Sequence, residues 1–97
     1  WELKGLALRA LGKYDEALSC FDRAISIDST RADAWKDKGE TYYMSGRYQE
    51  AVNCFDKAIQ ISPCADHWRL KAEALMGIGN DKEASDAFVM AKKSANC

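Results

Sequence analysis

The stretch ALSCFDRAI at residues 17–25 returns as AVNCFDKAI at residues 51–59, a shift of 34 residues. A looser third copy, ASDAFVMAK, occupies residues 84–92. Trp1, Trp35 and Trp68 each stand 16 residues ahead of one copy. Repetition at this period is typical of helical arrays, whose extended surfaces usually bind other proteins.

Turn residues divide each copy into two helices. Gly12, Gly46 and Gly79 follow apolar residues at helical spacing, and glycine just past a helix is the usual left-handed stop. Pro63 cannot continue a helix. The pattern predicts helices over residues 3–11, 15–27, 31–45, 48–61, 65–78 and 82–95. They form one domain over 1–97, with repeats over residues 1–30, 31–63 and 64–97.

The composition argues against nucleic-acid-binding and membrane-spanning functions. The chain is 47% hydrophobic and 30% charged, with a formal net charge of −1. This balance fits a packed domain and argues against nucleic-acid partners, which select a basic face. No apolar run reaches the roughly 18–20 residues that span a bilayer, so no membrane role is expected. There is neither a signal peptide nor an initiator Met, and we expect a fragment of a longer protein.

The four cysteines do not form a predicted disulfide framework. Cys20 and Cys54 occupy the same place in two repeats, beside a phenylalanine, as small buried apolar residues do. Cys64 lies in a loop, and Cys97 is the last residue. We expect all four to be reduced in a cytoplasmic protein.

Small residues recur where two helices should approach closely. Gly5 and Gly39 lie inside predicted helices, where glycine costs roughly 1 kcal/mol relative to alanine. Ala72 takes the third such place. Phe21 and Phe55 are the predicted large residues between layers, and we expect Phe55, in the middle repeat, to be among the most buried.

The pattern resembles the tetratricopeptide repeat, a helix-turn-helix unit of 34 residues. The tryptophan, small-residue and alanine-x3-aromatic positions of that family are matched in each copy by Trp1, Gly5, Ala17 and Phe21; by Trp35, Gly39, Ala51 and Phe55; and by Trp68, Ala72, Ala84 and Phe88. The chain departs from the family at Lys4, Lys38 and Lys71, where leucine is expected. We therefore predict an all-α, right-handed α-solenoid of six helices.

The resemblance implies that the first helices of the pairs line a concave groove for peptides or partner proteins. At helical spacing its residues form a stripe, called here the groove stripe. It comprises Glu2, Leu6 and Arg9; Asp33, Lys36, Asp37, Glu40, Tyr43 and Met44; and Asp66, Arg69, Glu73 and Met76.

The charges of the groove stripe predict its ligand. A subgroup of the family clamps acidic tails with lysine, arginine and asparagine, but the matching places here hold Glu2, Leu6, Asp37, Asp66 and Leu70. We expect a neutral to mildly basic peptide anchored by Tyr43, Met44 and Met76. Lys36 with Glu40, and Arg69 with Glu73, could instead form ordinary surface pairs.

Catalysis and cofactors are not expected. His67 lies three residues after Cys64, but one such pair cannot supply the four ligands of a structural zinc site. No glycine-rich phosphate loop is present. We therefore predict a binding protein that is not an enzyme and has no cofactor or metal.

The ends of the array suggest an alternative. Terminal repeats normally need a polar outer face, yet the last predicted helix carries Phe88, Val89 and Met90. These residues could join copies of the chain into a homo-oligomer. A protein-binding scaffold is the leading hypothesis, and a self-assembly module is the second.

Overall fold

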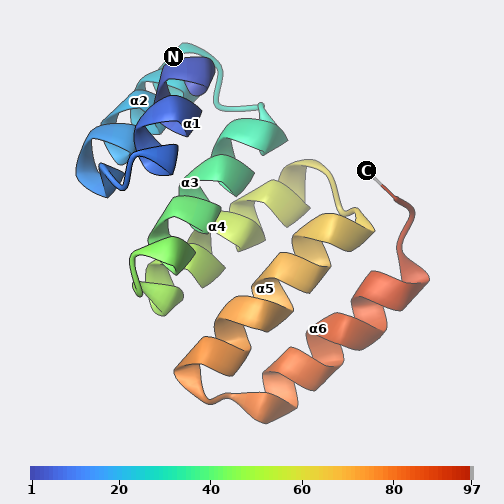
Figure 1. Ribbon diagram of the computed structural model, residues 1–97. Coiled ribbons are helices and arrows are strands. Elements are labelled where there is room, and N and C mark those ends of the chain that lie inside the picture. The colour runs from blue at the N-terminus through green and yellow to red at the C-terminus, as the bar shows by residue number, and fades with distance from the viewer. Residues whose placement is uncertain (97) are drawn as a thin grey trace.

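The computed structural model describes residues 1–96, which form six α-helices and no strand. The helices are α1 (Glu2–Ala10), α2 (Tyr14–Ile27), α3 (Ala32–Met44), α4 (Tyr48–Ile61), α5 (Ala65–Ile78) and α6 (Asp81–Lys93). Figure 1 shows them as three antiparallel pairs that follow one another in chain order. The predicted all-α solenoid of six helices is confirmed; α6 ends at Lys93 rather than Ala95.

Glycine ends the first helix of every pair. Gly12, Gly46 and Gly79 have φ angles of 79°, 84° and 91°. This left-handed conformation strains residues with a Cβ atom, so glycine turns the chain there at little cost. The second helix of each pair can then return alongside the first.

Inside each of the first two pairs, a phenylalanine ring lies against the backbone of a helical glycine. A Cβ atom added to Gly5 would lie 2.6 Å from Cε1 of Phe21, and one added to Gly39 would lie 2.6 Å from Cε1 of Phe55. Both rings are fully buried. The close approach predicted from the two glycines is confirmed, as is the burial of Phe55.

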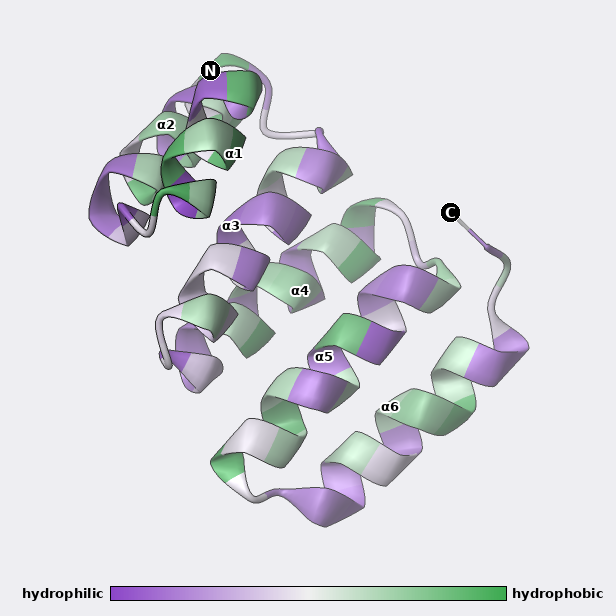
Figure 2. Cartoon of the chain, in the orientation of Figure 1, coloured by the Kyte–Doolittle hydropathy of each residue, from purple (hydrophilic) through white to green (hydrophobic). Residues whose placement is uncertain are grey.

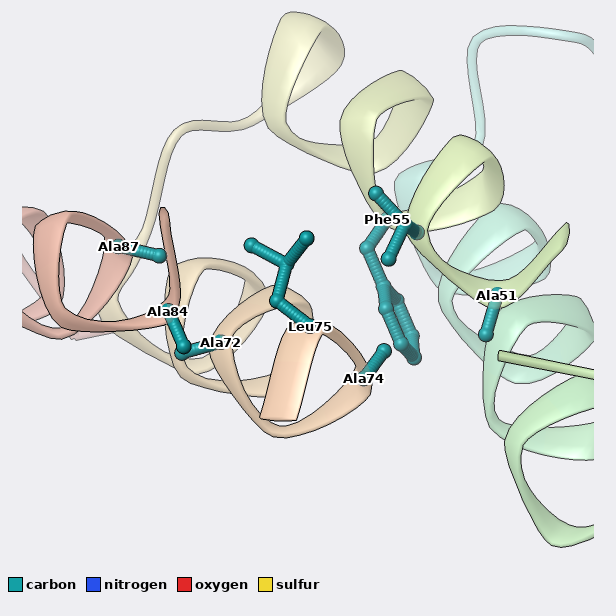
Figure 3. Packing of buried hydrophobic residues seen from close by; sticks show 8 residues of the cluster. Ala51, Phe55, Ala72, Ala74, Leu75, Ala84 and Ala87 are labelled. Carbon is teal, nitrogen blue, oxygen red and sulfur yellow. The ribbon is translucent and has the colours of Figure 1, made fainter. Parts of the chain in front are cut away.

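The buried core is built from small residues around few large ones. Its cluster joins α4, α5 and α6 and consists of Ala51, Val52, Phe55, Ala72, Ala74, Leu75, Ala84 and Ala87 (Figure 3). Phe88 packs against this cluster but is only partly buried. Figure 2 shows hydrophobic and hydrophilic residues interspersed along each helix, as expected where one side of a helix is buried and the other is exposed.

Successive pairs are joined by repeated ion pairs. Lys38 of α3 lies 2.7 Å from the Asp22 carboxylate of α2, and Lys71 of α5 lies 2.7 Å from the Asp56 carboxylate of α4. Both lysines occupy the place where the family has leucine. We call these two contacts the inter-repeat ion pairs.

The cysteines divide into two groups. Cys20 and Cys54 are free and buried, as predicted. Burial raises the pKa of the Cys54 thiol to about 11. Cys64 is disulfide-bonded, so the prediction that it is reduced was wrong. The prediction for Cys97 lies outside the described residues, and the cytoplasmic location stays a prediction.

We expect Phe55→Ala to lower the free energy of unfolding by roughly 3–5 kcal/mol, because it leaves a cavity between tightly packed helices. Phe88→Ala is the matched variant, and it should cost clearly less because its ring is only partly buried. Urea denaturation of both variants measures the difference. Equal losses would contradict the central position of Phe55 in the core.

Candidate interaction groove

The groove stripe lies on α1, α3 and α5, which are neighbours in space. Contacts join α1 to α3 and α3 to α5, so the stripe runs across three adjacent helices. All thirteen of its side chains are at least partly accessible to solvent. The structure thus leaves the predicted residues available for contact with a ligand.

A cluster of charges joins α1 to α3. The Arg9 guanidinium lies 3.7 Å from the Glu40 carboxylate and donates a hydrogen bond to the backbone carbonyl of Asp37 at 3.4 Å. Glu2 is paired with Arg31 at 2.8 Å. Glu40 therefore pairs with the preceding repeat rather than with Lys36 on its own helix.

Asp37 is the most perturbed acid of this cluster. Burial raises the pKa of its carboxyl to about 6, and the nearby Glu40 carboxylate raises it too, whereas Arg9 opposes the rise. The carboxyl thus changes its charge close to neutral pH. At pH 7 it adds negative charge at the centre of the groove stripe.

The α5 part of the stripe carries charges of its own. Arg69 lies 3.5 Å from Asp66, one turn away on the same helix. The alternative interpretation of the sequence paired Arg69 with Glu73, but the arginine pairs with Asp66 instead. Glu73 is partly exposed, and its carboxylate adds to the acidic character of the stripe.

Three apolar side chains of the stripe face solvent near the ends of the first helices. Tyr43 is 38% exposed, Met44 52% and Met76 55%. The Tyr43 ring also meets the Tyr48 ring edge to face, with centroids 5.3 Å apart. Tyr43 thus makes a contact with the next helix and is still 38% exposed.

The residues predicted for self-association do not share one exposed surface. Val89 and Met90 are 46% and 40% exposed. Phe88 instead turns toward the core cluster. Only two of the three are therefore largely available to a second copy.

Sequence reasoning missed a feature that recurs in all three pairs. Cavities of about 320, 240 and 330 Å³ lie at matching places between the two helices of each pair. Each is lined by the repeat's tryptophan and by the lysine three residues later. That lysine lies 5.4–5.5 Å from the centre of the tryptophan ring. The sequence could have revealed this feature, because Lys4, Lys38 and Lys71 each follow a tryptophan by three residues.

His67 has a structural role. It is buried, and its Nδ1 donates a hydrogen bond to the Ser62 carbonyl at 2.8 Å, which ties α5 to the preceding turn. Within residues 1–96 no group of three or more His, Cys, Asp or Glu side chains is placed to hold a metal ion. None of the helices described has the length and apolar character that crossing a membrane would require.

We expect Asp37→Asn to stabilise the protein at neutral pH. The pKa of Asp37 is about 6 in the folded protein and 3.8 in the unfolded chain, so folding favours the neutral carboxyl. The stability that this neutral form contributes is fully present below pH 3.8 and is lost as the pH rises through about 6. The amide cannot ionise and avoids this loss. After allowance for solvent screening, the gain at pH 7 should be roughly 1–2 kcal/mol.

Urea denaturation of both proteins between pH 4 and pH 7.5 tests this expectation. The difference between them should shrink toward zero at the acidic end, which serves as the internal control. A difference that does not change with pH would show that Asp37 ionises as easily in the folded protein as in the unfolded chain.

Solved structures with the same arrangement belong to repeat proteins. A structure of MamA superposes with a TM-score of 0.91 at 26% identity, over 95% of this chain and 51% of that one. The second TPR of Spaghetti (RPAP3), bound to HSP90 peptide SRMEEVD, gives 0.88 at 22% identity, over 96% and 87%. The Yersinia enterocolitica translocator chaperone SycD gives 0.90 at 18% identity, over 95% and 70%.

The chain spans about half the length of the MamA structure. No curated protein matches its sequence. Two tetratricopeptide repeat models match residues 1–63 and 46–95, and together they cover nearly the whole chain. The chain belongs to the tetratricopeptide repeat family.

Proposed function

We propose that the chain is a protein-interaction scaffold that holds a peptide or a loop of a partner against the groove stripe. The observation that carries this proposal is the exposure of Tyr43, Met44 and Met76 beside a cluster of charged side chains. Aromatic residues and methionine are enriched in the centres of interfaces, where they supply most of the affinity.

The charge of the groove stripe favours neutral or mildly basic ligands. It holds six acids, namely Glu2, Asp33, Asp37, Glu40, Asp66 and Glu73, against Arg9, Lys36 and Arg69. Arg9 and Arg69 are already paired with acids of the stripe. The acids left over would repel a carboxylate-rich peptide and attract a basic one, an effect that acts on selectivity and rate of approach.

The ligand class proposed for this groove differs from the peptide that one structural neighbour binds. The peptide SRMEEVD held by the RPAP3 repeat domain carries three acidic side chains. In this chain such a peptide would meet Asp37 and its acidic neighbours rather than an excess of cations. We therefore propose a partner of a different chemical class for this groove.

Peptide binding tests the proposal. Peptides of equal length with one central leucine, differing only in net charge from acidic to basic, are titrated at low and high salt. We expect the neutral and basic peptides to bind, and the Tyr43→Ala, Met44→Ala double variant to weaken them at least tenfold, the equivalent of about 1.4 kcal/mol.

Ile27→Ala is the matched control. Ile27 is 72% exposed but lies on a second helix, outside the groove stripe. Its truncation should leave peptide affinity unchanged. Tight binding of the acidic peptide, undiminished in the double variant, would place the binding surface elsewhere or reverse its charge preference.

A self-assembly module is the second candidate, and the exposure of Val89 and Met90 favours it. Apolar side chains of this size on an outer helix can join two copies of a chain. Sedimentation of the wild type and of the Val89→Glu, Met90→Glu variant over a range of concentrations tests this candidate. A dimer that the variant loses would support it, whereas a monomer throughout would exclude it.

A further inference from the structure

Asp37 is an acid at a place where the other two repeats have leucine. Counted from the tryptophan of each repeat, its counterparts are Leu3 and Leu70. Leu70 is partly buried and packs against the hydrophobic core cluster. Asp37 is likewise only partly accessible to solvent, so its carboxylate is desolvated where a leucine would not be penalised. The fold therefore does not require an acid at this place.

The Asp37 carboxylate has no cation paired with it among residues 1–96. The Arg9 guanidinium pairs with Glu40, and its hydrogen bond goes to the backbone carbonyl of Asp37 rather than to the carboxylate. Glu2 is paired with Arg31. Both neighbouring acids thus have a cation of their own, and Asp37 does not.

The charges around Asp37 leave its carboxylate poorly compensated. Burial is the largest cause of its raised pKa, and the carboxylates of Glu40 and Glu2 raise the pKa further. Arg9 and Lys36 act in the opposite direction without cancelling the rise. All four of these charged groups belong to α1 and α3. The charged side chains that α5 adds to the groove stripe are Asp66, Arg69 and Glu73, and the first two are paired with each other.

An apolar surface lies on the same side of α3. Seven residues make nearly two full turns of a helix, so Met44 is in line with Asp37 and about 10.5 Å further along the axis. Tyr43 stands beside Met44, and both side chains are exposed. The α3 part of the groove stripe thus offers a carboxylate without a partner and, about 10 Å away, two apolar side chains.

An extended peptide can contact both features at once. In the polyproline II conformation, which is common in unfolded chains, residues three apart point to the same side and lie about 9 Å apart. The long side chain of arginine or lysine covers the small remaining difference. A basic residue and an apolar residue at this separation therefore match the carboxylate and the apolar surface.

We propose that Asp37 binds the cationic side chain of a peptide ligand whose large apolar residue, three positions away, contacts Tyr43 and Met44. The inference rests on the proposed function, because it assigns a specificity-determining residue within the groove stripe. A charged group that the fold leaves without a partner would receive one from the ligand. Binding needs the ionised carboxylate, so affinity should fall as the pH is lowered through about 6.

Two peptides test the spacing. Each has blocked ends and a single arginine flanked on both sides by leucine, so that either chain direction can bind, and neither has another charged side chain. The leucines are three positions from the arginine in one peptide and adjacent to it in the other. We expect the first to bind about fivefold more tightly at pH 7.5, because only it reaches both features.

Asp37→Asn isolates the contribution of the carboxylate. It should weaken binding of the three-position arginine peptide about fivefold and leave unchanged the binding of an analogue in which neutral citrulline replaces arginine. Asp86→Asn is the matched control, because it removes the same charge from an exposed residue of α6 outside the groove stripe. Since Asp37→Asn is expected to stabilise the fold, weaker binding would not be a result of unfolding.

The pH dependence provides a second readout. Arginine keeps its charge throughout this range, whereas a carboxyl with a pKa of about 6 is nearly all ionised at pH 7.5 and about one-tenth ionised at pH 5. The wild type should therefore bind the arginine peptide up to about tenfold more weakly at pH 5. The Asp37→Asn variant should lose this dependence, and so should the citrulline peptide with the wild type.

The outcomes separate this inference from the proposed function. If Asp37→Asn changes neither affinity nor pH dependence while the Tyr43→Ala, Met44→Ala double variant weakens binding, the groove would stand and the role of Asp37 would be wrong. Equal affinity for the arginine and citrulline peptides would also overturn this role. If the wild type binds none of the peptides, the proposed groove fails and this inference fails with it.

Discussion

The array depends on one contact, in which a phenylalanine ring packs against the backbone of a helical glycine. At Gly5 and Gly39 there is no room for even a methyl group, because a Cβ atom would lie 2.6 Å from the ring. This contact sets the distance between the two helices of a pair. On the second helices of the same pairs, Ala17 and Ala51 are also fully buried.

The third pair shows what happens when this contact is relaxed. Ala72 replaces the glycine, and its methyl group occupies space that the ring takes in the other pairs. Phe88 is correspondingly only partly buried, and the interior is filled by Leu75 and several alanines. The interior of the last pair is continuous with α4, because Ala51, Val52 and Phe55 belong to the same cluster.

Core and binding surface use different residues of the same first helices. On α3, Gly39 and Thr41 are buried, while Tyr43 and Met44 remain exposed. The acids of the groove stripe contribute little to the core, and Asp37 carries a desolvation cost that shows in its raised pKa. Such a cost is common where a surface is arranged for a ligand rather than for stability.

The helices, their glycine stops and the close approach of two helices at Gly5 and Gly39 were predicted from the sequence because each depends on spacing within one repeat. Contacts between repeats were not. Arg9 meets Glu40 across 31 residues, so their pairing depends on how one pair rotates against the next. The alternative interpretation paired Lys36 with Glu40 and Arg69 with Glu73 within single helices. In the structure Glu40 pairs with Arg9 and Arg69 pairs with Asp66.

Two further misses have the same origin. Gly77 lies against the Tyr48 ring, where an added Cβ atom would be 2.8 Å from the ring carbon Cγ. Nothing in the spacing of either residue shows that the end of α5 meets the start of α4. The disulfide at Cys64 likewise depends on the distance between segments, which the repeat pattern does not report.

The tryptophan beneath each lysine gives every repeat a natural optical reporter. Trp1 is 53% exposed, and the indole nitrogen of Trp35 donates a hydrogen bond to the Ser29 carbonyl at 3.1 Å. The indole nitrogen of Trp68 is buried and has no hydrogen-bond partner within residues 1–96. The three indoles therefore emit from three different surroundings. With two of them replaced by phenylalanine, the fluorescence of the third would follow the opening of its own repeat, so the order in which the pairs separate can be read without an attached dye.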